Sequence, residues 1–123
     1  MLRSPNTTIG FALGRIAFGI GLLAAPERVA SGWLEDDARR PGTKVAIRGL
    51  GSRDIALAAG TALAARQGSD VRPWLIGCVA CDLSDIAATL AAGDSLGARA
   101  RWGTLALAGA AAAFGIALAA ASR

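Results

Sequence analysis

The chain has 123 residues, enough for one domain, and it is 54% hydrophobic but only 18% charged. This composition is too apolar for an ordinary soluble domain of this size, so a membrane protein is the first hypothesis. The net charge is +4, but the arginines flank apolar segments and form no basic run interleaved with aromatic residues, which argues against nucleic-acid binding. The chain contains no histidine and no tyrosine, which removes imidazole ligands and Ser-His or Cys-His catalytic pairs.

The first predicted span runs from about Ile9 to Ala25. Arg3 followed by this apolar stretch is similar to a secretory signal peptide, but Arg15 interrupts the stretch and Pro26 would follow the cleavage point. We therefore expect a retained transmembrane helix that ends at Pro26.

The segment 26–44 is the only long connection. Pro26 suits the start of a helix. Trp33 and Leu34 could lie at the level of the headgroups while the acidic residues 35–37 stay in water, which would make a short interfacial helix. A plain solvated loop is the alternative of equal weight.

Three further apolar segments follow, at about Val45–Ala65, Trp74–Leu90 and Trp102–Ala121. The last has no charged residue, and at ~1.5 Å per residue its length matches a hydrocarbon core of roughly 30 Å. Short links after the second and third spans force antiparallel neighbours. We expect an all-α fold, an integral membrane four-helix up-down bundle formed as a single domain by residues 1–123 and located in the cell membrane as a multi-pass protein. A soluble alanine-rich helical bundle is the alternative, because alanine is only weakly hydrophobic.

Ionised residues lie inside these apolar segments: Arg15, Arg48, Arg53, Asp54, Asp82 and Asp85. Charges in hydrocarbon are costly and mark paired, interior or functional sites. The rise of a helix places Arg48 near an interface, where its long side chain can reach the headgroups, whereas the other charges overlap in depth. Depth favours a pair between Arg53 and Asp85, and a second pair between Arg15 and either Asp82 or Asp54. The expected charge or binding network therefore consists of Arg15, Arg53, Asp54, Asp82 and Asp85.

This network combines two arginines with three aspartates. If all were ionised, one net negative charge would lie in a medium of low dielectric constant. One aspartate should then be protonated, or a cation, a water chain or Arg48 should compensate the charge. Polar contacts that fix helix packing would explain the same residues without any chemistry.

Cys78 and Cys81 share one stripe of the third span with Asp82 and Asp85, and we expect this stripe to face inward. The Cys-x-x-Cys spacing is typical of redox or metal sites, but neither a βαβ context nor a second ligand pair accompanies it. We therefore expect free thiols, no metal and no other cofactor. The Asp82-x-x-Asp85 spacing invites comparison with CDP-alcohol phosphotransferases, but their motif of clustered aspartates on two helices is missing.

Glycines recur on the first two spans, at Gly10, Gly14 and Gly21 and at Gly49 and Gly60. Small residues let helix backbones approach closely. We expect these glycines to pack helices within the monomer, with dimerisation as the alternative.

Several short motifs form a recognisable set: Leu13-Gly14-Arg15, Ala25-Pro26, Trp33, Arg48-x-x-Gly51-x-Arg53-Asp54 and Asp82-x-x-Asp85. With these motifs the chain resembles small uncharacterised four-helix integral membrane proteins that are common in actinobacteria and grouped under domains of unknown function. The resemblance implies a four-span bundle and no assigned activity.

We expect a structural or accessory membrane protein and not an enzyme, because no combination of nucleophile and base is visible. Its partners would be the lipid bilayer, and a second copy or another membrane protein that meets the acidic loop. The alternative is an oligomeric proton- or ion-coupled carrier of small solutes, in which an intramembrane aspartate titrates and Arg15 or Arg53 assists.

Overall fold

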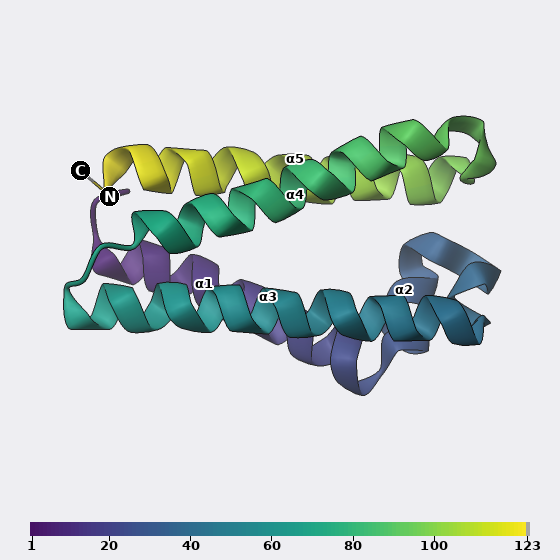
Figure 1. The fold of residues 1–123 in the computed structure, drawn as a ribbon, viewed down its shortest axis with the longest axis horizontal. Helices are drawn as coiled ribbons and strands as arrows, with labels where there is room; N and C mark the ends of the chain where they lie inside the picture. Colours follow the sequence, from purple (N-terminus) through teal and green to yellow (C-terminus); the bar gives the residue numbers. More distant parts are fainter. Residues whose placement is uncertain (123) are drawn as a thin grey trace.

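All regular elements are helical in the computed structural model, which describes residues 1–122. In chain order they are α1 (Pro5–Ala24), α2 (Pro26–Leu34), the 3₁₀ helix η1 (Glu35–Arg39), α3 (Pro41–Gln67), α4 (Arg72–Ala92), the 3₁₀ helix η2 (Gly93–Ser95) and α5 (Ala98–Ala121). The all-α class expected from the sequence is confirmed. The long helices are α1, α3, α4 and α5. Each of the last three reverses the direction of the long helix before it, so α1 begins at the end of the molecule where α5 finishes (Figure 1).

The long helices begin earlier than the apolar segments that predicted them. Proline stands in the first turn of α1, α3 and α4, where its missing N–H costs no hydrogen bond and its fixed φ suits the helix. The ends are set by glycine, since Gly68 and Gly93 have positive φ angles of 68° and 53° directly after α3 and α4. The expected bounds 45–65 and 102–121 therefore start too late because they follow hydropathy alone.

Three helical segments are long and apolar enough to cross a membrane, namely Pro5–Ala24, Arg72–Ser95 and Ala98–Ala121. They correspond to the first, third and fourth predicted spans. Helix α3 is the longest, with 27 residues, but it is not one of these three segments. Its charged residues, Arg53 and Asp54 among them, make it less apolar than the other long helices. The structure thus supports three of the four spans on length and composition.

The connection between α1 and α3 is largely helical, which decides between the two alternatives for the segment 26–44 in favour of a short helix, α2, that starts at Pro26. Trp33 faces the bundle, with its ring centroid 6.2 Å from that of Phe18. The acidic residues 35–37 are exposed. The inward position of Trp33 is a finding that the sequence did not indicate.

The long helices form two pairs, α1 along α3 and α4 along α5, and the pairs diverge toward the end that carries α2 (Figure 1). One apolar cluster, around Leu22 and Ile47, lies where α1 and α3 meet α2, and Phe18 packs against it. A second cluster, around Leu75 and Leu118, includes Phe11 at its edge. The segment of α1 between these two phenylalanines is where the buried charge lies.

Glycine sets the contact between α1 and α3, but at other positions than expected. A Cβ on Gly19 would lie 2.7 Å from the Gly51 carbonyl oxygen, and one on Gly51 would lie 2.6 Å from that of Gly19. The prediction was wrong for three glycines that have open space around them: Gly10, Gly14 and Gly49. Spacing alone does not reveal which face of an alanine-rich helix meets its neighbour. Gly60 does make a close contact, with the ring of Trp74.

Candidate functional site

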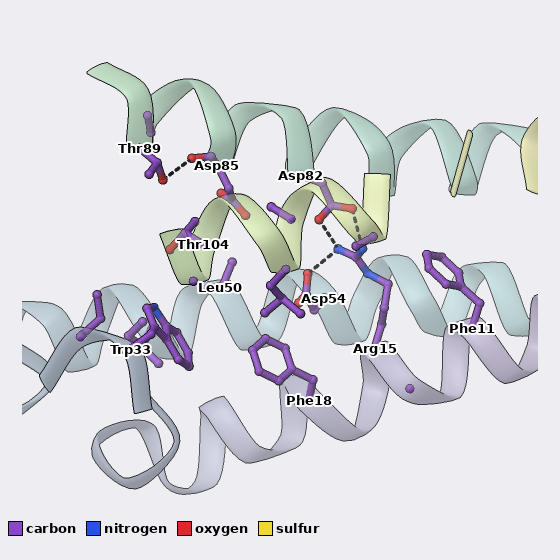
Figure 2. A pocket seen from close by; sticks show the side chains of 18 of the residues that line it. Phe11, Arg15, Phe18, Trp33, Leu50, Asp54, Asp82, Asp85, Thr89 and Thr104 are labelled. Carbon is purple, nitrogen blue, oxygen red and sulfur yellow. Dashed lines mark hydrogen bonds and ion pairs between the residues drawn. The ribbon is translucent and has the colours of Figure 1, made fainter. Parts of the chain in front are cut away.

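Arg15 lies in the middle of α1 and joins three helices (Figure 2). Its Nη1 donates to Asp82 Oδ2 on α4 at 2.7 Å, and its Nη2 donates to Asp82 Oδ1 at 3.0 Å. Nη2 also donates to Asp54 Oδ1 on α3 at 2.9 Å. The side chains are 10% exposed for Arg15 and 7% for each aspartate, so the guanidinium and both carboxylates are almost completely removed from solvent.

A second pair extends this arrangement. Arg53 on α3 donates from Nη2 to Asp85 Oδ2 on α4 at 2.8 Å, and from Nη1 to Asp85 Oδ1 at 3.4 Å. Arg53 Nε lies 4.0 Å from Asp54 Oδ1. The two pairs therefore form one continuous network, which is more open at its Asp85 end, where both side chains are 32% exposed.

The structure brings together all five residues that the sequence placed in the network, and the pairings are those that depth favoured. Arg15 contacts both of the aspartates between which depth could not choose. Arg48 lies outside the network, as expected. Its Nε donates to the Leu23 carbonyl oxygen, near the end of α1, at 3.3 Å.

Within residues 1–122, the network leaves two donor atoms without a hydrogen bond and one negative charge in excess. Arg15 Nε and Arg53 Nε are buried and have no hydrogen-bond partner within the described part of the chain. Its two arginines also face three aspartates. Since Arg48 is engaged elsewhere, it does not compensate the excess negative charge. The Arg15 guanidinium carbon lies 5.8 Å from the centroid of the Phe11 ring, which favours the positive charge at this end.

The stripe of α4 that carries Asp82 and Asp85 faces the interior of the bundle over most of its length. Cys78, Asp82 and Thr89 are buried, and Cys81 and Asp85 are partly buried. Both cysteines are free thiols. Among residues 1–122 no group of three or more His, Cys, Asp or Glu side chains could hold a metal ion.

A cavity of about 680 Å³ lies between the two helix pairs, against the charge network. All three carboxylates line it, together with the hydroxyl residues Thr89 and Thr104. Figure 2 shows Phe11 and Phe18 on α1 and Trp33 on α2 along one side of the same space. Sequence reasoning missed this cavity. The available signal was the pair of glycines on α1, Gly10 and Gly14, which line it and leave space where side chains would otherwise fill it.

A second cavity of about 660 Å³ lies where α2 begins, and basic side chains from three elements line it: Arg28, Arg39, Lys44 and Arg48. Glu27 Oε2 forms an ion pair with Lys44 Nζ at 2.9 Å, and Glu27 Oε1 lies 3.6 Å from Arg39 Nε. The hydrogen bond and charge of Lys44, with a smaller effect of Arg39, hold the pKa of Glu27 below its usual range. These ion pairs connect α2 with η1 and with the first turn of α3.

No protein-family model, curated protein or solved structure matches the chain.

Proposed function

We propose that the protein is an integral membrane four-helix up-down bundle with a structural or accessory role and no enzymatic activity. The observation that carries this proposal is the bridge of Arg15 between Asp54 and Asp82, which ties α1 to α3 and α4 in the interior. Such a bridge sets the register of three helices at once.

The surface of the bundle supports membrane insertion. Large apolar side chains are exposed along the long helices, among them Ile20 (53%), Leu63 (56%), Ile76 (60%) and Ile116 (53%). A surface of this kind favours association in water and suits contact with lipid chains. The cell membrane is therefore the location that we propose.

Helix α3 serves as the fourth span in this proposal, although its composition is less apolar than that of the other three. Its charges at mid-length are paired with neighbouring helices: Asp54 with Arg15, and Arg53 with Asp85. Ionised residues inside a membrane protein are tolerated when they face the interior and pair with one another. The fourth span would thus depend on the network, which links the topology to the charged residues.

The first experiment asks whether the protein is integral and whether the bridge stabilises it. Membranes that contain the protein are washed with alkaline carbonate, and thermal unfolding is then followed in detergent for the wild type, Arg15→Gln and the control Arg72→Gln. Arg72 pairs with Asp70 on the surface, so its loss should cost little. We expect retention in the membrane and a large loss of stability for Arg15→Gln alone. Extraction by carbonate, or equal stability of Arg15→Gln and wild type, would contradict the proposal.

A second candidate is an oligomeric proton- or ion-coupled carrier, and the cavity beside the network favours it. The three carboxylates of the network line a space of about 680 Å³, as a titrating group of a carrier requires. Flux into proteoliposomes tests this candidate. A carrier should lose pH-linked flux in Asp85→Asn while the variant remains folded, whereas a purely structural protein shows no such flux in any variant.

The partners of the structural role would be lipid, a second copy or another membrane protein. The exposed acidic residues 35–37 of η1 offer the polar surface for such a contact. Crosslinking from Asp36→Cys in intact membranes tests this surface, and the absence of any adduct would argue against it.

A further inference from the structure

The cavity between the helix pairs has the size and lining of a ligand site. Its volume of about 680 Å³ falls within the roughly 300–1,000 Å³ that is usual for small-molecule pockets. Packing defects in protein interiors are far smaller, since interiors are close-packed. The walls are mostly apolar, with Ile47 and Leu50 from α3 and Leu107 from α5, and a small number of charged and hydroxyl groups stand among them. This combination is typical of a pocket that binds an apolar body and orients it through one polar end.

The charge of the cavity indicates the sign of its ligand. The network brings two guanidinium groups against three carboxylates, and no other Lys or Arg among residues 1–122 lines this space. Two other arginines of the helices that line it bond elsewhere, Arg48 with the Leu23 carbonyl and Arg101 with Asp94 at 3.2 Å. One negative charge is left over when all three carboxylates are ionised.

Asp85 is the carboxylate that a ligand can reach. Its side chain is 32% exposed, against 7% for Asp54 and Asp82. Only one of its contacts with Arg53 is short, at 2.8 Å, and the other measures 3.4 Å. Asp85 lines the cavity from α4, as Leu50 does from α3 and Thr104 from α5 (Figure 2). A cation placed there would lie against the most open carboxylate of the network.

The aromatic side chains favour an organic cation over a bare metal ion. Phe18 and Trp33 lie 6.2 Å apart between centroids and both line the cavity. Aromatic faces attract cations with apolar substituents, whereas apolar walls cannot replace the hydration shell of a small inorganic ion. Phe11 already lies against Arg15, whereas no arginine of the described residues lies over Phe18 or Trp33, so this pair is the aromatic surface that a cation can use.

We propose that this cavity binds a hydrophobic organic monocation, with its charge near Asp85 and its apolar body between the aromatic pair and α5. This binding site is an addition to the structural role. It needs only the cavity of the folded bundle, and it does not need the protein to transport anything. A failure of binding in a protein that is folded and membrane-integral would therefore leave the structural proposal intact.

The test compares two ions of the same shape and opposite charge, tetraphenylphosphonium and tetraphenylborate, by calorimetric titration of the detergent-purified full chain. We expect saturable binding of the cation at one site per chain and much weaker binding of the anion. Asp85→Asn should weaken cation binding about tenfold or more, since a charge contact of about 1.4 kcal/mol corresponds to a factor of ten. The matched control is Asp94→Asn, because Asp94 is exposed, pairs with Arg101 and does not line the cavity.

A second variant keeps the test decisive if Asp85→Asn fails to fold. Gly14 lines the cavity with open space where its Cβ would be, so Gly14→Leu should fill part of the cavity without touching a charge. It should reduce cation binding while the melting temperature stays near that of the wild type. Equal binding of both ions, unchanged binding in folded Asp85→Asn, or no binding to the folded wild type would overturn the proposal. Co-purified phospholipid that occupies the cavity and excludes both ions would overturn it as well.

Discussion

The bridge of Arg15 depends on the shape of its side chain. A guanidinium presents several N–H donors in one plane, so that it can bind Asp82 with two nitrogens and still donate to Asp54. An ammonium carries its charge at one point and cannot reproduce this geometry. The residue type at position 15 therefore matters as much as its charge.

Arg15→Lys tests this dependence at constant charge. We expect a loss of about 2 kcal/mol or more in the free energy of unfolding, since at least one hydrogen bond between charged groups is lost. Reversible unfolding in mixed detergent micelles measures the loss. Lys44→Arg is the reciprocal control and should be nearly neutral, because arginine can keep the partly exposed ion pair with Glu27. A lysine variant as stable as the wild type would show that charge alone suffices.

The three aspartates should differ in their effect on stability when each is replaced by asparagine. Asp82 accepts two hydrogen bonds from Arg15 in a buried position, so Asp82→Asn should destabilise the protein most. Asp85 is a third exposed, and its pair with Arg53 is partly screened. Removing its charge also removes the excess of the network, so Asp85→Asn should cost least. Thermal unfolding in detergent ranks the variants, and an equal loss in all three would argue against a network with a surplus member.

At the scale of the elements, α1 and α3 approach each other through Gly19 and Gly51. Each lies against the backbone carbonyl of the other, which leaves no room for a methyl group. This approach brings the α1 and α3 backbones together one turn from Arg15. Close packing of the two backbones and the reach of Arg15 to Asp54 are therefore parts of the same contact.

Gly51→Ala and Gly49→Ala separate this contact from helix propensity. The new Cβ at position 51 would meet the Gly19 carbonyl oxygen at 2.6 Å, whereas position 49 has open space. We expect Gly51→Ala to lower stability by about 1–3 kcal/mol through overpacking. Gly49→Ala should leave stability unchanged or raise it by up to about 1 kcal/mol, because alanine is the better helix former. Equal effects in chemical denaturation would show that the α1–α3 contact is looser than the structure indicates.

The attachment of α2 should depend on pH through Glu27. The pKa of Glu27 is depressed in the folded protein by Lys44 and then Arg39, so its contacts stabilise the fold above the usual carboxyl range. This contribution is lost as the pH falls through the depressed pKa. We expect the fluorescence of Trp33, in a Trp74→Phe/Trp102→Phe background, to change as the pH falls below the ordinary titration range of a glutamate carboxyl. Glu27→Gln should abolish this change, and a transition that persists in Glu27→Gln would assign it to another group.

Breakers and hydropathy predicted the four long helices, and Pro26, Gly68 and Gly93 do stand at helix ends, but hydropathy alone placed the starts of the long helices too late. Depth along antiparallel helices predicted the pair of Arg53 with Asp85, but it left the partner of Arg15 open between Asp54 and Asp82, and Arg15 contacts both. The rotation of each helix was harder to predict, because alanine and glycine are spread over every face and the apolar pattern has little direction. For this reason the contact of Gly19 with Gly51 appeared only in the structure.

At the scale of the whole molecule, the charge network and the cavity both lie between the same two helix pairs. The α1–α3 pair and the α4–α5 pair have their own close contacts, and the network is the polar link across the interior between them. The two pairs diverge toward α2 (Figure 1), and the cavity lies between them. A bundle with its middle fastened by ion pairs can leave such a space open, whereas an apolar interior would tend to close it. Gly10 and Gly14 leave space on the α1 side of this cavity, but its position depends on how the two pairs are placed, which the sequence does not give.

The proposed topology makes a prediction about sidedness that depends on α3. In a four-span bundle the η1 segment and the turn before α5 lie on one side of the membrane, and the α3–α4 turn lies on the other. If α3 does not cross, the η1 segment and the α3–α4 turn share a side. Single cysteines at Asp36→Cys, Ser69→Cys and Ser95→Cys, in a Cys78→Ala/Cys81→Ala background, report these three positions.

A membrane-impermeant maleimide applied to sealed vesicles of one orientation, before and after lysis, reads out the sidedness. We expect the cysteines at positions 36 and 95 to react together and the cysteine at position 69 to react only from the opposite side. Adding Arg15→Gln to these variants then tests whether the fourth span needs its partner, because Asp54 would lie in the membrane without its guanidinium. If positions 36 and 69 are labelled from the same side only when Arg15→Gln is present, the network holds α3 in the membrane. The same pattern in the wild-type background would reduce the bundle to three spans.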